Sequence, residues 1–163
     1  MNTGIQKSGS TPYGAWTTTT PLGKDRNKKD VALILAQHDV PYIATVSVAY
    51  PNDIKRKISK AKCINGFRYI HNVMPCPTGW RFDPAKSIEV IRRGVQTWAL
   101  PLYEVEDGIL NLSMNPKQKP VEEYLKMQNR FRNLTSEQII FIQQQVNRKR
   151  NWLIENNGKH IRP

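Results

Sequence analysis

From Asp30 onward, hydrophobic and polar positions change their spacing along the chain in a way that predicts alternating helices and strands. Residues 31–36 are mostly apolar and predict a helix. Residues 41–48 form a short, nearly uninterrupted run of β-branched and apolar side chains, which is typical of a buried strand. A helix over about 51–62 follows, because proline suits its first turn and apolar residues recur on one face.

The second half of the chain continues this alternation and ends in helices. The predicted elements are, in order, a strand at 67–73, a tight loop at 74–80, a helix at 84–98, a hairpin pairing 102–106 with 109–112, and helices at 121–128 and 136–151. Such alternation indicates an α/β fold with a mainly parallel sheet. Because two central strands alone would leave open edges, we expect other sequence or another chain to complete the sheet. We place a domain boundary between an α/β part, 1–115, and a helical C-terminal extension, 116–163.

Residues 1–23 differ from the rest because they are rich in Gly, Ser, Thr and Pro, a composition that favours turns. An irregular segment of this length is commonly a binding loop or disordered. It opens with Asn2-Thr3-Gly4, whose oxygens are of the kind that Mg²⁺ prefers and whose glycine lets the backbone approach a diphosphate. The same tripeptide is common in ordinary polar turns, so both interpretations stay open.

Cys76 lies in a loop bracketed by prolines, 75–80, directly after the second predicted strand. Loops at strand ends bind ligands in open α/β sheets, which favours a positioned thiolate, whereas a lone cysteine is more commonly a small buried side chain. One thiolate cannot hold an iron–sulfur cluster, because four ligands are needed. Cys63 ends an amphipathic helix and is interpreted as a packing residue. The three histidines show no metal-ligand spacing.

The net charge of +12 raises the question of an acidic partner or nucleic acid. The basic residues are spread over several segments without a recognition motif, so solvated helix faces are the first interpretation, an acidic partner the second and nucleic acid the third. No apolar run approaches the roughly 20 residues needed to span a bilayer. Together with the two cysteines, which are too few for a disulfide framework, this predicts a cytoplasmic protein away from membranes.

Taken together, these motifs resemble the beta subunits of pyruvate:ferredoxin oxidoreductase, a 2-oxoacid:ferredoxin oxidoreductase. The segments that carry the resemblance follow the family's order and are 2–6, 11–15, 17–21, 23–24, 28–30, 41–45, 49–51 and 75–80. The resemblance covers residues 1 to 106, and less distinctly the tail.

The resemblance implies that thiamine diphosphate is held through Mg²⁺ by a Gly-Asp-Gly segment and by an Asn-Thr-Gly turn. Asn2 would support the diphosphate, Thr3 would give its hydroxyl to Mg²⁺, and Ile5 its backbone carbonyl. Cys76 would be the last of four thiolates that bind a 4Fe–4S cluster. The implied reaction converts pyruvate and coenzyme A to acetyl-CoA and carbon dioxide, with electrons passed to ferredoxin. Alpha, gamma and delta-type subunits would be the partners.

The departures from the family pattern predict an incomplete subunit. The sequence has no Gly-Asp-Gly segment, and its only cysteine besides Cys76 is Cys63. We therefore expect the C-terminal part of the thiamine-diphosphate-binding subunit, which alone binds neither cofactor and is inactive. Pyruvate is the first expectation for the substrate, although branched-chain and indole relatives share the chemistry. The alternatives are a basic nucleic-acid-binding module and a non-catalytic module that packs against partner subunits.

Overall fold

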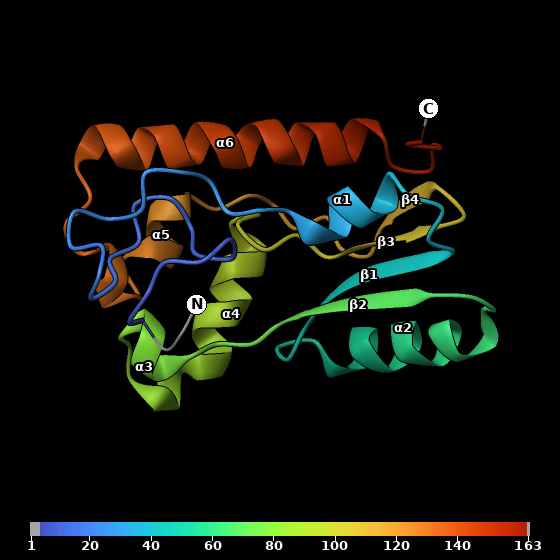
Figure 1. The fold of residues 1–163 in the computed structure, drawn as a ribbon, viewed down its shortest axis with the longest axis horizontal. Helices are drawn as coiled ribbons and strands as arrows, with labels where there is room; N and C mark the ends of the chain where they lie inside the picture. The colour runs from blue at the N-terminus through green and yellow to red at the C-terminus, as the bar shows by residue number, and fades with distance from the viewer. Residues whose placement is uncertain (1–3, 163) are drawn as a thin grey trace.

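A four-stranded sheet forms the centre of the fold in the computed structural model, which describes residues 4–162 (Figure 1). The strands are β1 (Tyr42–Ser47), β2 (Arg68–Val73), β3 (Tyr103–Glu106) and β4 (Ile109–Leu112), in the order β2-β1-β3-β4. The helices are α1 (Val31–Ala36), α2 (Pro51–Cys63), α3 (Pro77–Trp80), α4 (Ser87–Gln96), α5 (Val121–Leu125) and α6 (Ser136–Glu155), with 3-10 turns η1 (Pro84–Lys86) and η2 (Asn129–Phe131).

The α/β class is confirmed, and the sheet is mixed. β1 pairs with β2 in parallel, whereas β3 pairs antiparallel with both β1 and β4. The hairpin therefore covers the free edge of β1, where other sequence was expected. Thr45 makes this contact specific, because its hydroxyl accepts the Tyr103 N–H at 2.9 Å and donates to the Pro101 carbonyl at 2.9 Å. β2 and β4 are the edge strands of the described sheet.

A buried charge network fixes α2 to one face of the sheet. Lys57 is fully buried, and its ammonium donates to the Thr45 carbonyl and to Asp53, both at 2.7 Å. Glu104, on β3, accepts from the Tyr42 hydroxyl at 2.6 Å. Because Lys57 and Glu104 each have hydrogen-bond partners, their charges are compatible with the interior between α2 and the sheet.

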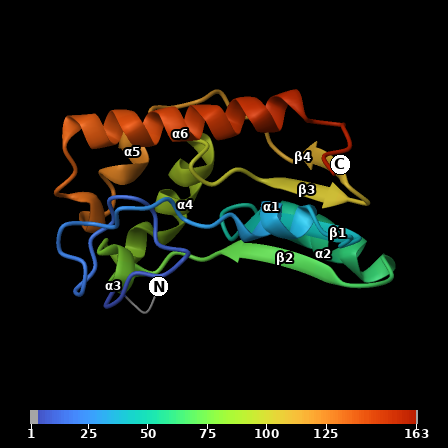
Figure 2. The same cartoon turned by 45° about the horizontal axis from the view of Figure 1, so that its top comes forward.

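On the opposite face lie α1 and the long helix α6 (Figures 1 and 2). Thr135 begins α6 with a capping box, in which its hydroxyl accepts the Gln138 N–H and the Gln138 side chain accepts the Thr135 N–H. Leu153, near the other end of the helix, is fully buried against the core beneath α1. Segment 116–163 thus packs onto the sheet and α4; the domain boundary at 115 stays a prediction.

Two elements differ from the sequence expectation. The helix expected at 84–98 is divided into η1 and α4, because Ser87 closes a 3-10 turn with its hydroxyl on the Pro84 carbonyl at 2.6 Å. The loop at 74–80 contains the short helix α3. Within residues 4–162, no helix combines the length and the apolar character that crossing a membrane requires.

Candidate functional site

The N-terminal turn rests on the threonine-rich segment. Asn2 and Thr3 lie outside the described residues. The Gly4 carbonyl accepts the Thr18 N–H at 3.0 Å, and the Ile5 carbonyl accepts both the N–H and the hydroxyl of Thr19, at 2.9 and 3.0 Å. The oxygen of Ile5 expected to bind Mg²⁺ therefore already has two hydrogen bonds, and metal coordination would replace one of them. The metal role of Ile5 stays a prediction.

Lys24 holds the irregular opening segment in one conformation. Its side chain is buried, and the ammonium donates to the carbonyls of Thr11 at 2.6 Å and Ser8 at 3.0 Å. Burial lowers the pKa of Lys24, since removal from water disfavours the charged form. Nearby, the Thr17 hydroxyl is buried and has no hydrogen-bond partner among the described residues. Such an orphaned polar atom fits a polar ligand that satisfies it.

Cys76 begins α3 as its capping residue. Its sulfur accepts the Gly79 N–H at 3.3 Å, and Pro77 occupies the first turn of the helix. Cys76 is free and half-buried. An N–H directed at sulfur and a fixed backbone suit a thiolate ligand, because both favour a charged sulfur in one position.

The structure brings this loop and the N-terminal turn together. Gly4 has a φ of +83°, and a Cβ there would lie 3.1 Å from the Cα and from the carbonyl oxygen of Gly79. The two backbones therefore touch, and Figure 1 draws the first described residues, in dark blue, beside α3. Gly4 and the Cys76 loop, which have β1 and β2 between them in the sequence, thus meet in the fold.

Two cation–aromatic pairs include residues next to this contact, and the sequence pattern did not predict them. The Arg81 guanidinium lies 3.6 Å from the centre of the Trp16 ring, and that of Arg130 lies 4.2 Å from the centre of the Trp80 ring. The Trp16 N–H donates to the Arg130 carbonyl at 2.7 Å. Burial lowers the pKa of Arg130 to about 10, and the interactions of Arg130 with Tyr124 and, more weakly, with Cys76 partly oppose this shift. The sequence carries no local signal for these pairs, because each joins an aromatic residue to an arginine far away in the chain.

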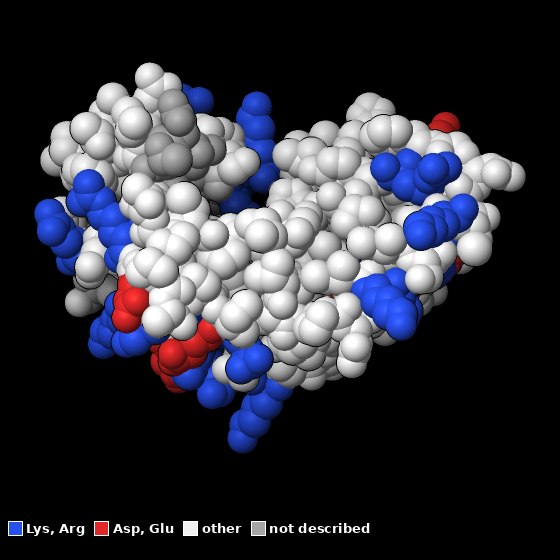
Figure 3. All heavy atoms as spheres, turned by 90° about the horizontal axis from the view of Figure 1, so that it is seen from below, with Lys and Arg blue, Asp and Glu red and all other residues white. Residues whose placement is uncertain are grey.

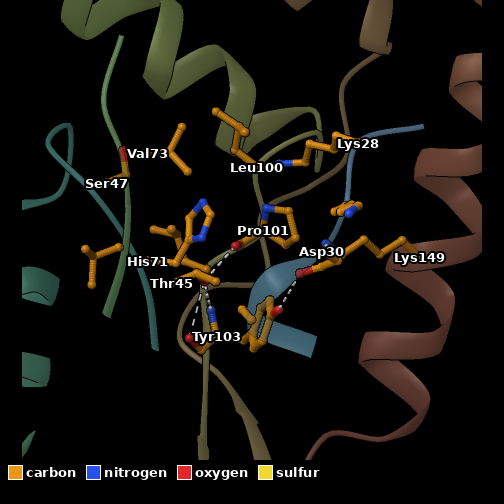
Figure 4. Close-up of a pocket in the computed structure, with 14 residues that line it drawn as sticks. Lys28, Asp30, Thr45, Ser47, His71, Val73, Leu100, Pro101, Tyr103 and Lys149 are labelled. Carbon is orange, nitrogen blue, oxygen red and sulfur yellow. Dashed lines mark hydrogen bonds and ion pairs between the residues drawn. The ribbon is translucent and has the colours of Figure 1, made fainter. Parts of the chain in front are cut away.

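A small cavity of about 30 Å³ lies at the carboxyl ends of β1 and β2 (Figure 4). Figure 4 shows three charged residues on one side and three strand residues on the other: Lys28, Asp30 and Lys149, and Ser47, His71 and Val73. A cavity of this volume has room for about one water molecule. His71 lies with its Nδ1 3.2 Å from the Tyr69 hydroxyl oxygen. Burial and the charge of Lys28 lower the pKa of His71, so its neutral form is favoured.

Neither the other cysteine nor the acidic residues complete a metal site here. Among residues 4–162, no three His, Cys, Asp or Glu side chains are close enough to hold a metal ion. Cys63 is exposed at the end of α2, which lies toward the opposite end of the molecule from α3 (Figures 1 and 2). On the face drawn in Figure 3, Lys and Arg occupy several separate areas, as solvated helix faces predict.

Comparisons with known proteins show close relatives, although no family model matches the chain. It is 55% identical over 152 residues to pyruvate synthase subunit PorB of Methanothermobacter thermautotrophicus, covering 90% of this chain and 53% of that protein. It is 49% identical to the subunit of the same name from Methanocaldococcus jannaschii, covering 91% and 52%. It is 52% identical to ketoisovalerate oxidoreductase subunit VorB of Pyrococcus horikoshii, covering 90% and 50%. The chain spans about half the length of these relatives.

Proposed function

Because the chain belongs to the family of 2-oxoacid:ferredoxin oxidoreductase beta subunits, we propose that it is the C-terminal part of a thiamine-diphosphate-binding subunit. The contact between Gly4 and Gly79 carries this proposal, because it joins the turn expected to hold Mg²⁺ to the loop of the cluster cysteine. Relatives named for pyruvate and for ketoisovalerate are about equally similar. Pyruvate is our first proposal for the substrate, and a branched-chain 2-oxoacid is the second.

In this proposal Asn2 supports the diphosphate, while Thr3 and Ile5 supply a hydroxyl and a carbonyl oxygen to Mg²⁺. When bound, thiamine diphosphate supplies the carbanion chemistry of decarboxylation, and the protein supplies orientation and exclusion of water. Gly4 lets the backbone come close, since a side chain there would meet Gly79. Lys24 keeps the loop in place, and the unpartnered Thr17 hydroxyl is available to a polar ligand.

Cys76 is proposed as one of four thiolates around a 4Fe–4S cluster. The hydrogen bond that the Gly79 N–H donates to its sulfur supports this role, since such a bond favours negative charge on sulfur. The 163 residues contain two cysteines, and Cys63 lies elsewhere, so the remaining ligands must come from other sequence. The chain alone is accordingly proposed to bind neither cofactor stably.

The proposed partners are the remainder of the subunit, the alpha, gamma and delta-type subunits, coenzyme A and ferredoxin. The open edge of β2 suits continuation of the sheet by the remainder of the subunit. The net charge of +12 suits an acidic electron carrier, because opposite charge speeds encounter. The free cysteines are compatible with the reducing cytoplasm as the location.

Reconstitution of the isolated chain tests the proposed division of the site. The chain, supplied with iron, sulfide, Mg²⁺ and thiamine diphosphate, is expected to form no stable cluster chromophore and to show no cofactor binding by calorimetry. The assembled oxidoreductase containing the chain is expected to reduce ferredoxin with pyruvate. A stable chromophore on the isolated chain with about four irons per chain would contradict the shared cluster. If the assembly oxidises a branched-chain 2-oxoacid and not pyruvate, the first substrate proposal is wrong and the second one holds.

A further inference from the structure

A groove of about 470 Å³ runs between α6 and the body of the protein. Helix α6 contacts α5 and β4, and the Gln143 side chain accepts the Val121 N–H at 2.7 Å. The groove opens along a neighbouring face of α6. Its volume lies within the range of small-molecule sites, about 300–1,000 Å³.

Apolar and aromatic side chains form most of the groove. Ile142, Val146 and Trp152 line it from one face of α6, at spacings that suit a helix. The side chains that line it from the body are Trp98, Ala99, Leu100, Val121, Tyr124, Leu125 and Phe131. The Trp98 ring is held in place in this wall, because its ring N–H donates to the Pro116 carbonyl at 3.1 Å. The groove therefore has walls that suit the apolar body of a ligand.

More positive than negative side chains line the groove. The described residues that line it include three cations, Lys28, Arg148 and Lys149, and one carboxylate, Asp30. Asp30 already forms an ion pair with Lys149 and accepts the Tyr103 hydroxyl at 3.4 Å. A further anion in the groove would therefore meet no unpaired carboxylate among these residues.

Lys28 lines both the groove and the small cavity at the carboxyl ends of β1 and β2 (Figure 4). It forms no hydrogen bond or ion pair with the described part of the chain, unlike Lys149. Burial, together with the nearby charge of Lys149, lowers the pKa of Lys28 to about 8. Lys28 is half-buried, and an anion beside a partly desolvated cation without a partner would be favourable.

We propose that this groove binds an amphipathic organic carboxylate, with the carboxylate at Lys28 and the apolar body between α6 and the aromatic residues of the opposite wall. A single carboxylate would pair with the Lys28 ammonium, which has no partner among the described residues. The adjoining cavity leaves room for a water molecule that binds the carboxylate. The groove is separate from the described residues assigned to the thiamine and cluster sites, since neither Ile5 nor Cys76 lines it.

Calorimetric titration of the 163-residue chain with dodecanoate tests the proposal, with dodecanol as the probe of the same chain length without the charge. We expect one dodecanoate per chain and at least about tenfold weaker binding of dodecanol, because a charge-assisted contact is lost. Lys28→Gln is expected to weaken dodecanoate binding by a similar factor. Lys55→Gln removes an exposed lysine of α2 and is the matched control, expected to leave the affinity unchanged.

Ala99→Phe fills the groove from the body and is expected to abolish binding while near-ultraviolet circular dichroism stays native. Equal affinity for dodecanoate and dodecanol, an unchanged affinity in Lys28→Gln, or several dodecanoates per chain would each overturn the proposal. Failure of the wild-type chain to bind dodecanoate would also overturn it, and would point to a polypeptide as the occupant of the groove. Cluster and thiamine binding can succeed or fail independently of these results.

Discussion

Glu104 shows how one buried carboxylate joins a helix to the sheet. Arg56 and Lys60 of α2 each donate to it at 3.1 Å, and Tyr42 of β1 donates at 2.6 Å. Burial alone would raise the pKa of Glu104, but these hydrogen bonds outweigh burial and hold the pKa below its usual value. The folded state therefore favours the ionised form.

This depressed pKa gives a pH-dependent prediction for Glu104→Gln. Because the folded pKa lies below the unfolded one, the stabilisation is complete above the unfolded value of about 4.5 and is lost as the pH falls through the folded pKa. At pH 7 the variant should lose about 2 kcal/mol of unfolding free energy, since hydrogen bonds to a charge are removed. Urea denaturation across pH 3–7 should show this difference shrinking toward acid. Glu155→Gln changes an exposed carboxylate and should show no such trend; a pH-independent loss in Glu104→Gln would contradict the assignment.

For helices and strands, the sequence predicts those features that depend on residues close together in the chain. The β-branched run of β1, the proline that starts α2 and the Asp107-Gly108 turn of the hairpin each act within a few residues. The pairing of β3 with β1 was not predictable, because it depends on Thr45 meeting Tyr103 across 58 positions. The cation–aromatic pairs of Arg81 and Arg130 were missed for the same reason.

Helix α6 offers a direct test at this scale, because a capping box starts it. Thr135→Ala removes the hydroxyl that accepts the Gln138 N–H at 3.2 Å and should lower the unfolding free energy by about 1 kcal/mol. Thermal and urea denaturation measure the loss. Ser136→Ala, one residue further on, leaves the cap intact and should change stability by less than about 0.5 kcal/mol. Equal effects of the two substitutions would show that the cap does not hold the helix start.

In the whole molecule, two motifs that lie far apart in the sequence come into contact in the fold. The sequence resemblance identified the Asn-Thr-Gly turn and the Cys76 loop separately, and the contact of Gly4 with Gly79 brings them to one place. The groove under α6 had no sequence signal, because its walls come from segments that become neighbours only on folding. The proposed cluster would take further ligands from other sequence, because the 163 residues contain two cysteines and Cys63 lies away from Cys76.

The most direct test of the central claim is electron paramagnetic resonance of the reduced, assembled oxidoreductase that contains this chain with Cys76→Ser. We predict that in Cys76→Ser the signal of one 4Fe–4S cluster disappears and the iron content falls by about four per chain. Cys63→Ser, the matched control, should keep both signal and iron content, because that thiol is exposed at the end of α2. Retention of every cluster signal and of all iron in Cys76→Ser would contradict the account.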